Sequence, residues 1–162
     1  MVTIRKAGLK DIEGLVKLWK EFFDEHDSNV IRGNPNLKPY LIKKKDSRKI
    51  FETFAKRNIR SPNGNVFVAE FEGEIIGYVL IFIKKNTPVF ELEKTGHISD
   101  LFVRKKYRGS KISSEFKDKS IQWFKEKGLE HASILVSAEN KNAHKIYKKW
   151  GFQDYHVELR KK

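Results

Sequence analysis

The segment from His97 to Gly128 constrains the fold more than any other part of the chain. Ile98–Val103 has the composition of a short β-strand, a polar turn follows at 107–113, and the next residues carry apolar side chains at helical spacing (Ile112, Phe116, Ile121, Trp123 and Phe124). A strand that turns directly into a helix leaves unpaired N–H groups at the positive end of the helix dipole, which favours phosphate binding. Arg108 and Lys111 add positive charge there. The sequence therefore predicts a strand–phosphate loop–helix unit.

The size and composition of the chain predict one domain spanning residues 1–162. With 39% hydrophobic and 12% aromatic residues, the chain has enough apolar side chains for a core. The longest apolar run, 75–83, is too short to cross a bilayer, and residues 1–5 show no secretory pattern. The absence of cysteine excludes disulfides, thiolate catalysis and cysteine-type zinc sites, and no metal is expected. We expect a cytoplasmic protein.

The net charge of +13 has three interpretations. Lysine and arginine gather in four clusters, at 43–45, 104–106, 148–149 and 160–162. They could form a solvated surface, attract an anionic ligand or bind nucleic acid. No base-stacking motif or helix-turn-helix pattern accompanies the charge, so nucleic acid is the least favoured partner.

Hydrophobic periodicity and turn residues predict ten elements in the order β-α-α-β-β-β-α-β-α-β. Strands are expected at 3–5, 66–71, 75–83, 98–103, 133–137 and 152–160, and helices at about 11–23, 47–59, 112–127 and 141–150. Asn29–Lys45 is expected to be a loop, and Gly77 indicates a bulge or a close backbone approach. Only the crossover through the third helix makes two strands parallel. The fold class is therefore α/β, with a mixed, largely antiparallel sheet and helices on both faces.

Two motifs resemble the GNAT superfamily of acetyl-CoA-dependent N-acetyltransferases. The first is Asp-Leu-Phe-Val-x-x-x-Tyr-Arg-Gly at 100–109, and the second is Val-x-x-x-Asn-x-x-Ala-x-x-x-Tyr-x-x-x-Gly-Phe at 136–152. The resemblance implies the fold described above and acetyl-CoA as cosubstrate. In the family the phosphate loop carries further glycines, at the positions that Lys111 and Ser113 occupy here. The Lys111 side chain could crowd the diphosphate of CoA or bind it through its ammonium group.

The resemblance also implies a set of cofactor-binding residues. In the family, main-chain groups of the strand before the loop pair with the pantetheine arm, and main-chain amides of the loop bind the pyrophosphate. The corresponding residues here are Leu101, Phe102 and Val103 on the strand and Arg108, Gly109, Ser110, Lys111, Ile112 and Ser113 in the loop. Asn140 corresponds to a family asparagine that hydrogen-bonds CoA. Taken alone, an asparagine before a helix is usually an N-cap.

The catalytic residues predicted are Tyr147 and Asp100. Tyr147 matches the family tyrosine that protonates the departing thiolate, although its helical spacing with neighbouring apolar residues would also suit a core aromatic. Asp100, expected on the same face as Ile98 and Phe102, could deprotonate or orient the amine, or form an ion pair with a neighbouring cation. His97 is a further candidate for the base, and Glu70 is a weaker one.

The predicted function is direct transfer of an acetyl group from acetyl-CoA to a primary amine. The acceptor could be a small amine, a polyamine or a protein N-terminus, and a second copy of the chain could complete a homodimer. The alternative is a catalytically weak or inactive regulator on the same fold that binds CoA or nucleic acid. Lys111 and Ser113, in place of the loop glycines, are the features that support this alternative.

Overall fold

The computed structural model describes all residues 1–162 and contains one five-stranded sheet. The strands lie in the order of the chain: β1 (Thr3–Lys6), β2 (Gly64–Phe71), β3 (Glu74–Lys85), β4 (Lys94–Val103) and β5 (Ala132–Ile134). The first three pairings are antiparallel, and only β4 and β5 are parallel. This confirms the mixed, largely antiparallel sheet.

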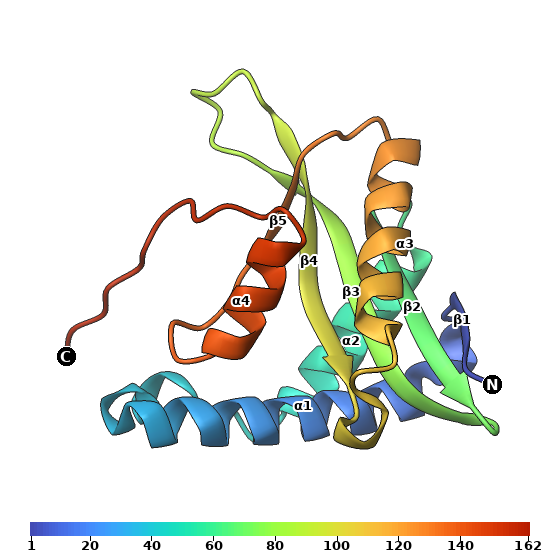
Figure 1. Cartoon of the computed structure of the whole chain (residues 1–162), viewed down its shortest axis with the longest axis horizontal. Helices are drawn as coiled ribbons and strands as arrows, with labels where there is room; N and C mark the ends of the chain where they lie inside the picture. Colours follow the sequence, from blue (N-terminus) through green and yellow to red (C-terminus); the bar gives the residue numbers. More distant parts are fainter.

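Helices cover both faces of this sheet, as Figure 1 shows. The helices are α1 (Ile12–Gly33), α2 (Ser47–Arg60), α3 (Ile112–Glu126) and α4 (Lys141–Lys149), with short 3-10 turns η1 (Leu9–Asp11), η2 (Pro35–Tyr40) and η3 (Lys105–Tyr107). One buried cluster joins α1 and α2 to one face through Leu15, Ala55 and Leu80. A second joins α3 to the other face through Val79, Phe116 and Phe124. The strands therefore alternate between two cores.

Helix α1 is longer than its apolar stripe predicts. We expected a loop from Asn29 to Lys45, but α1 continues to Gly33 and the six residues of η2 follow almost at once. Val30 is only 3% exposed and belongs to the buried hydrophobic residues, which explains why the last turns of the helix are retained. Tertiary packing thus extends the helix beyond the point where the sequence pattern becomes ambiguous.

The closing strand predicted at Phe152–Arg160 is wrong: the chain after α4 forms no strand. Figure 1 shows this segment leaving the body of the molecule. Tyr155, Val157 and Leu159 do alternate, but they are 85%, 81% and 89% exposed. An alternating pattern determines which side chains share a face, whereas a strand also needs a neighbour for its hydrogen bonds. No main-chain hydrogen bond within the chain is made beyond Phe152.

A β-bulge in β4 changes which side chains face each core. Leu80 of β3 pairs with Asp100, but the next residue, Ile81, pairs with Ile98, so Ser99 is the extra residue. Consequently Ile98 joins the core beneath α3, whereas Phe102 joins the core beneath α1 and α2. The expectation that Asp100 shares a face with Ile98 is therefore wrong.

Both features predicted for Gly77 on β3, a bulge and a close backbone approach, are present. The register between β2 and β3 shifts next to it, because Ala69 pairs with Gly77 and Glu70 pairs with Ile75. A Cβ atom added at Gly77 would lie 2.8 Å from the carbonyl oxygen of Phe102, closer than van der Waals contact allows. Glycine at this position therefore lets β3 and β4 approach where the bulges bend them.

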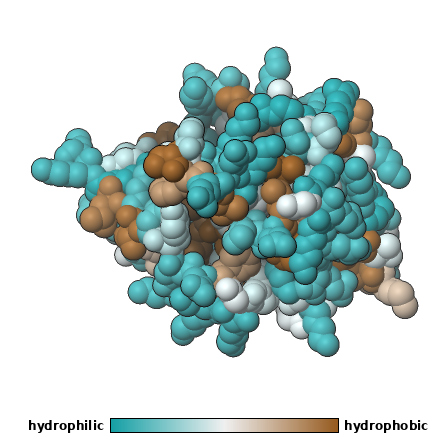
Figure 2. Space-filling model, turned by 90° about the horizontal axis from the view of Figure 1, so that it is seen from above, coloured by the Kyte–Doolittle hydropathy of each residue, from teal (hydrophilic) through white to brown (hydrophobic).

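The molecular surface is strongly hydrophilic. Figure 2 shows hydrophilic side chains over most of one face, with hydrophobic side chains in scattered groups. No helix is long and apolar enough to cross a membrane. The cytoplasmic location stays a prediction.

Candidate active site

The site begins where β4 and β5 separate. Their parallel pairing ends at Ile98 and Ile134, although β4 continues to Val103. A cavity of about 510 Å³ opens there. Its walls come from β4, the chain after β5, α1, the start of α3, and α4. A gap between two diverging parallel strands, beside a helix N-terminus, suits an extended ligand with a phosphate group.

The loop before α3 presents six consecutive main-chain N–H groups without a partner. The amides of residues 109–114 donate no hydrogen bond to any acceptor of the chain, and the first amide of α3 that does is that of Glu115, bonded to the Lys111 carbonyl. Gly109 and Lys111 both have left-handed backbones, with φ of 82° and 68°. These two residues turn the chain so that the amides are exposed in series, which is the arrangement that binds a diphosphate.

The predicted loop residues do not all lie at the cavity. Gly109, Ile112 and Ser113 line it, as does Arg108, whereas Ser110 and Lys111 do not. The Ser110 hydroxyl donates to the Tyr107 carbonyl oxygen. These two residues could contribute their main-chain amides.

The guanidinium group of Arg108 is already engaged. It forms a two-pronged ion pair with Glu25 of α1, at 2.7 and 2.9 Å, and its Nε donates to the Val103 carbonyl oxygen at 2.8 Å. Arg108 therefore braces the phosphate loop against α1 and the end of β4. Its charge near the loop is partly neutralised by Glu25.

Helix α4 places the two remaining family positions on the opposite wall. The Asn140 side chain caps the helix by accepting a 3.2 Å hydrogen bond from the Ala143 amide, and it lines the cavity together with Tyr147. The Tyr147 ring packs against Trp150 and Phe152, with ring centres 5.5 and 6.4 Å away. Burial raises the pKa of the Tyr147 phenol, so this group stays protonated at neutral pH. Its hydroxyl makes no hydrogen bond within the chain and is free to act on a ligand.

Asp100 lies apart from these groups. Its side chain is buried, it does not line the cavity, and it accepts hydrogen bonds from Tyr78 at 2.9 Å and Ser99 at 3.2 Å. Burial raises the pKa of the Asp100 carboxyl, more than these two hydrogen bonds lower it. The bulge at Ser99 turns this side chain toward the core beneath α1 and α2. Its catalytic role stays a prediction that this position does not favour.

The other two candidate bases, His97 and Glu70, also form their contacts outside the cavity. Burial lowers the pKa of His97 to about 4, and its Nδ1 lies 2.8 Å from the Ser133 hydroxyl, which joins β4 to β5. Glu70 accepts hydrogen bonds from Arg5 at 2.6 and 3.0 Å. Neither residue lines the cavity.

Sequence reasoning missed the contribution of α1. Phe22, Glu25, His26 and Asn29 all line the cavity from this helix. Their spacing, i, i+3, i+4 and i+7, places them on one helical face, which is a signal that the sequence contains. It was overlooked because the helix was expected to end before Asn29.

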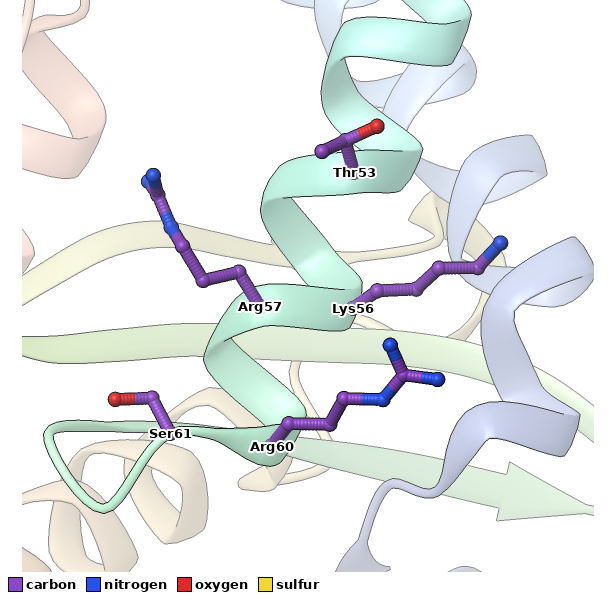
Figure 3. Close-up of a pocket in the computed structure, with 5 residues that line it drawn as sticks. All are labelled: Thr53, Lys56, Arg57, Arg60 and Ser61. Atoms are coloured by element: carbon purple, nitrogen blue, oxygen red, sulfur yellow. The ribbon is translucent and has the colours of Figure 1, made fainter.

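A second hollow, of about 460 Å³, lies on α2 far from these residues and has no hydrophobic lining (Thr53, Lys56, Arg57, Arg60 and Ser61). Figure 3 shows Arg57 pointing to the side opposite Lys56 and Arg60. Lys56 pairs with Glu52, and the Arg57 guanidinium lies over the Phe54 ring. Because the cations diverge, this hollow does not form a convergent anion site.

The fold and the site together define a protein class: one with a cavity where two parallel strands separate, beside a loop of unpaired amides at a helix N-terminus. Residues 17–152 match the model of the acetyltransferase (GNAT) family, and the chain belongs to this family. A predicted acetyltransferase from Clostridium acetobutylicum, whose crystal structure contains acetyl-CoA, has the same fold (TM-score 0.79, 23% identity, 99% of this chain and 96% of that chain). Its likeness confirms the predicted fold.

Two of the relatives in sequence bear on the function. An uncharacterised N-acetyltransferase of Methanocaldococcus jannaschii is 27% identical over 155 residues, 96% of this chain and 62% of the relative. An N-alpha-acetyltransferase of Sulfurisphaera tokodaii is 33% identical over 98 residues, 56% of this chain and 58% of the relative. The chain thus aligns with about three-fifths of the length of each of these relatives.

Proposed function

We propose that this protein transfers an acetyl group from acetyl-CoA to a primary amine, directly and without a covalent enzyme intermediate. One observation carries the proposal: the Tyr147 side chain and the loop that bears six free amides border the same cavity between β4 and α4. Family membership supports acetyl-CoA as the cosubstrate.

The phosphate loop fits the diphosphate of CoA. The unpaired amides of residues 109–114 can donate to phosphate oxygens, and the α3 dipole favours negative charge at the same position. We propose that main-chain groups of Leu101, Phe102 and Val103 pair with the pantetheine arm. We also propose that the Asn140 side chain, which lines the other wall, hydrogen-bonds this arm. The Val103 carbonyl oxygen already accepts from Arg108, so this pairing relies more on Leu101.

Tyr147 is the proposed general acid. When the amine nitrogen attacks the thioester carbonyl, a C–N bond forms and the C–S bond breaks. The departing thiolate then takes a proton from the Tyr147 phenol, which its raised pKa has kept protonated. The half-buried ring and its contacts with Trp150 and Phe152 hold the hydroxyl in place for this transfer.

Among the acceptors, we propose the α-amine of a protein or peptide. The net charge of +13 disfavours a highly cationic acceptor such as a polyamine. The Sulfurisphaera tokodaii relative is named an N-alpha-acetyltransferase, which also supports a terminal α-amine. An acceptor peptide with acidic residues would complement the basic surface.

An acceptor screen tests this proposal. The protein is incubated with acetyl-CoA and a panel of acidic peptides, neutral peptides, polyamines and aminoglycosides, and thiol release is followed with a chromogenic reagent. We expect the highest kcat/KM with an acidic peptide, and mass spectrometry should place the acetyl group on its N-terminus. Acetylation of polyamines alone would overturn the acceptor assignment, and no thiol release with any amine would overturn the activity.

The alternative, a regulator without catalytic activity, is supported by the strained backbone of Lys111, where the family has a glycine. A thermal-shift experiment separates the two functions. Acetyl-CoA at 100 times its dissociation constant should add about 2.7 kcal/mol to the free energy of unfolding, roughly 5–10 °C for a domain of this size. A salt-sensitive shift with RNA and none with acetyl-CoA would favour the regulator.

We also propose that the protein forms a homodimer through its C-terminal segment. Residues 153–162 make no main-chain hydrogen bond, and β5 lies at the edge of the sheet with one side unpaired. If the alternating segment Tyr155–Leu159 of each copy paired with β5 of the other, both unpaired edges and three exposed apolar side chains would be covered. Light scattering after gel filtration should give a dimer, and a chain truncated after Gln153 should be a monomer. A full-length monomer would contradict the exchange.

A further inference from the structure

We infer that His26 is the general base that deprotonates the acceptor amine, and that Asp27 orients its imidazole. This inference rests on the proposed acetyl transfer and names the residue that completes it. The positions of the bases predicted from sequence do not favour a catalytic role, because Asp100, His97 and Glu70 all lie outside the cavity. His26 is the histidine that lines it.

The geometry around His26 is that of an oriented base. Its Nδ1 atom lies 3.1 Å from the Asp27 carboxylate oxygen Oδ1. In the tautomer with the proton on Nδ1, the Nδ1–H group donates a hydrogen bond to this carboxylate. The lone pair of Nε2 is then free to accept a proton from an acceptor in the cavity. The Phe22 and Phe23 rings, whose centres are 4.8 Å apart, pack together against one side of the imidazole, each with its ring centre 6.0 Å away in an edge-to-face arrangement. The His26 side chain keeps 22% of its surface exposed, so an acceptor can reach it.

Asp27 is itself fixed by a third group. Its second oxygen, Oδ2, accepts a hydrogen bond from the Lys43 ammonium, in the segment between η2 and α2. The Lys43 ammonium also lies 4.8 Å from the centre of the Phe23 ring. Asp27 therefore holds a defined position, with its side chain only 15% exposed. In many active sites a third group orients the catalytic base in this way.

The remaining charged groups near His26 do not compete for the amine proton. Glu25 precedes it on α1 and lines the same cavity, but it is paired with Arg108 from the phosphate loop. Tyr147 faces it from α4 and is protonated. Asp27 is held by Lys43. The imidazole of His26 is therefore the group that can accept the amine proton.

The protons balance in this scheme. The acceptor ammonium gives one proton to Nε2 of His26, and the neutral amine then attacks the thioester carbonyl. As the C–S bond breaks, Tyr147 gives its proton to the sulfur, and the second amine proton replaces it. His26 finally releases its proton to solvent, so that each turnover yields an amide, a thiol and one proton.

The test compares kcat/KM as a function of pH for the wild type, His26→Gln and Asp27→Asn, with the exposed His131→Gln as matched control. General-base catalysis typically contributes about 100- to 10,000-fold, so we expect His26→Gln to lose at least about 100-fold at pH 7. Part of the rate should return at higher pH, where the amine deprotonates in solution. Asp27→Asn should lose part of the same rate, because the imidazole no longer has the carboxylate that orients it. The control should match the wild type.

Two further measurements separate the possible failures. The thermal shift with acetyl-CoA should be unchanged in His26→Gln, which shows that the fold and the cosubstrate site are intact. Added imidazole should partly restore turnover of His26→Ala, which a merely structural role would not allow. Wild-type turnover with an unaltered pH profile in His26→Gln would overturn the role of His26 while leaving the acetyltransferase proposal standing. If that variant does not fold, Asp27→Asn decides, and wild-type kcat/KM in Asp27→Asn overturns the inference.

Discussion

The Tyr78 hydroxyl donates a 2.9 Å hydrogen bond to the Asp100 carboxyl group, diagonally across β3 and β4. Both side chains are buried, and burial is the main reason that the pKa of each group is raised. The pair lies in the core beneath α1 and α2, outside the cavity. It therefore fixes the register next to the Ser99 bulge, beyond which β4 borders the cavity.

Asp100→Asn should gain stability relative to the wild type as the pH rises. Because the folded-state pKa of Asp100 lies above its unfolded value, its contribution to stability is complete below about pH 4 and is lost as the pH rises through the raised pKa. Asparagine does not ionise and keeps an acceptor for Tyr78. Melting temperatures from pH 4 to 8 check this. Asp154→Asn is the control, since the hydrogen bond from His144 lowers the pKa of Asp154 and its difference should have the opposite sign. A difference for Asp100→Asn that is independent of pH would contradict the prediction.

His97 should destabilise the protein as the pH falls. Its folded-state pKa of about 4 lies below the ordinary value of 6.5, mainly because the imidazole is buried. Its contribution to stability is therefore present above about pH 6.5 and is lost as the pH falls toward 4. Unfolding by urea at several pH values should show this loss in the wild type and a smaller one in His97→Gln. Equal slopes in the two proteins would show that His97 is not the group responsible.

Tyr147→Phe should slow acetyl transfer by about 100-fold or more, because the thiolate loses its proton donor. Acetyl-CoA binding should change little, since the ring and its contacts with Trp150 and Phe152 remain. Thiol release measures the first quantity and the thermal shift measures the second. Tyr155→Phe, at an exposed tyrosine outside the cavity, is the matched control. Unchanged turnover in Tyr147→Phe would remove this residue from the role of general acid.

Substitutions at Lys111 should decide between crowding and binding. Lys111 has a left-handed backbone, which costs a side-chain-bearing residue about 1–2 kcal/mol, so Lys111→Gly should relieve strain that Lys111→Ala retains. If the ammonium group binds the diphosphate, both variants weaken acetyl-CoA binding. We expect this result, because the lysine side chain does not line the cavity and can reach the diphosphate from outside. Tighter binding in both variants, measured by calorimetry, would instead indicate crowding.

Local features of the chain were predictable from sequence. The Glu72–Glu74 hairpin turn, the Asn140 cap and the strand–loop–helix unit around Gly109 occur where expected. Each depends on contacts between residues close in the chain: turn conformation, a capping side chain, or the spacing of apolar residues along one helix. The two family motifs lie within the same segments, which is why most of the residues predicted to bind the cosubstrate line one cavity.

The acceptor side of the site depended on tertiary structure. The Ser99 bulge arises from pairing between two strands and turns Asp100 away from the cavity, and no alternation within β4 alone could show it. The Arg108–Glu25 pair joins residues 83 positions apart. The length of α1, and with it the position of His26, depends on packing around Val30. Sequence by itself determined most of the elements and the loop before α3, because these follow from short-range backbone geometry and hydrophobic spacing. Which side chains meet in the cavity was decided only when strands and helices distant in the chain packed together.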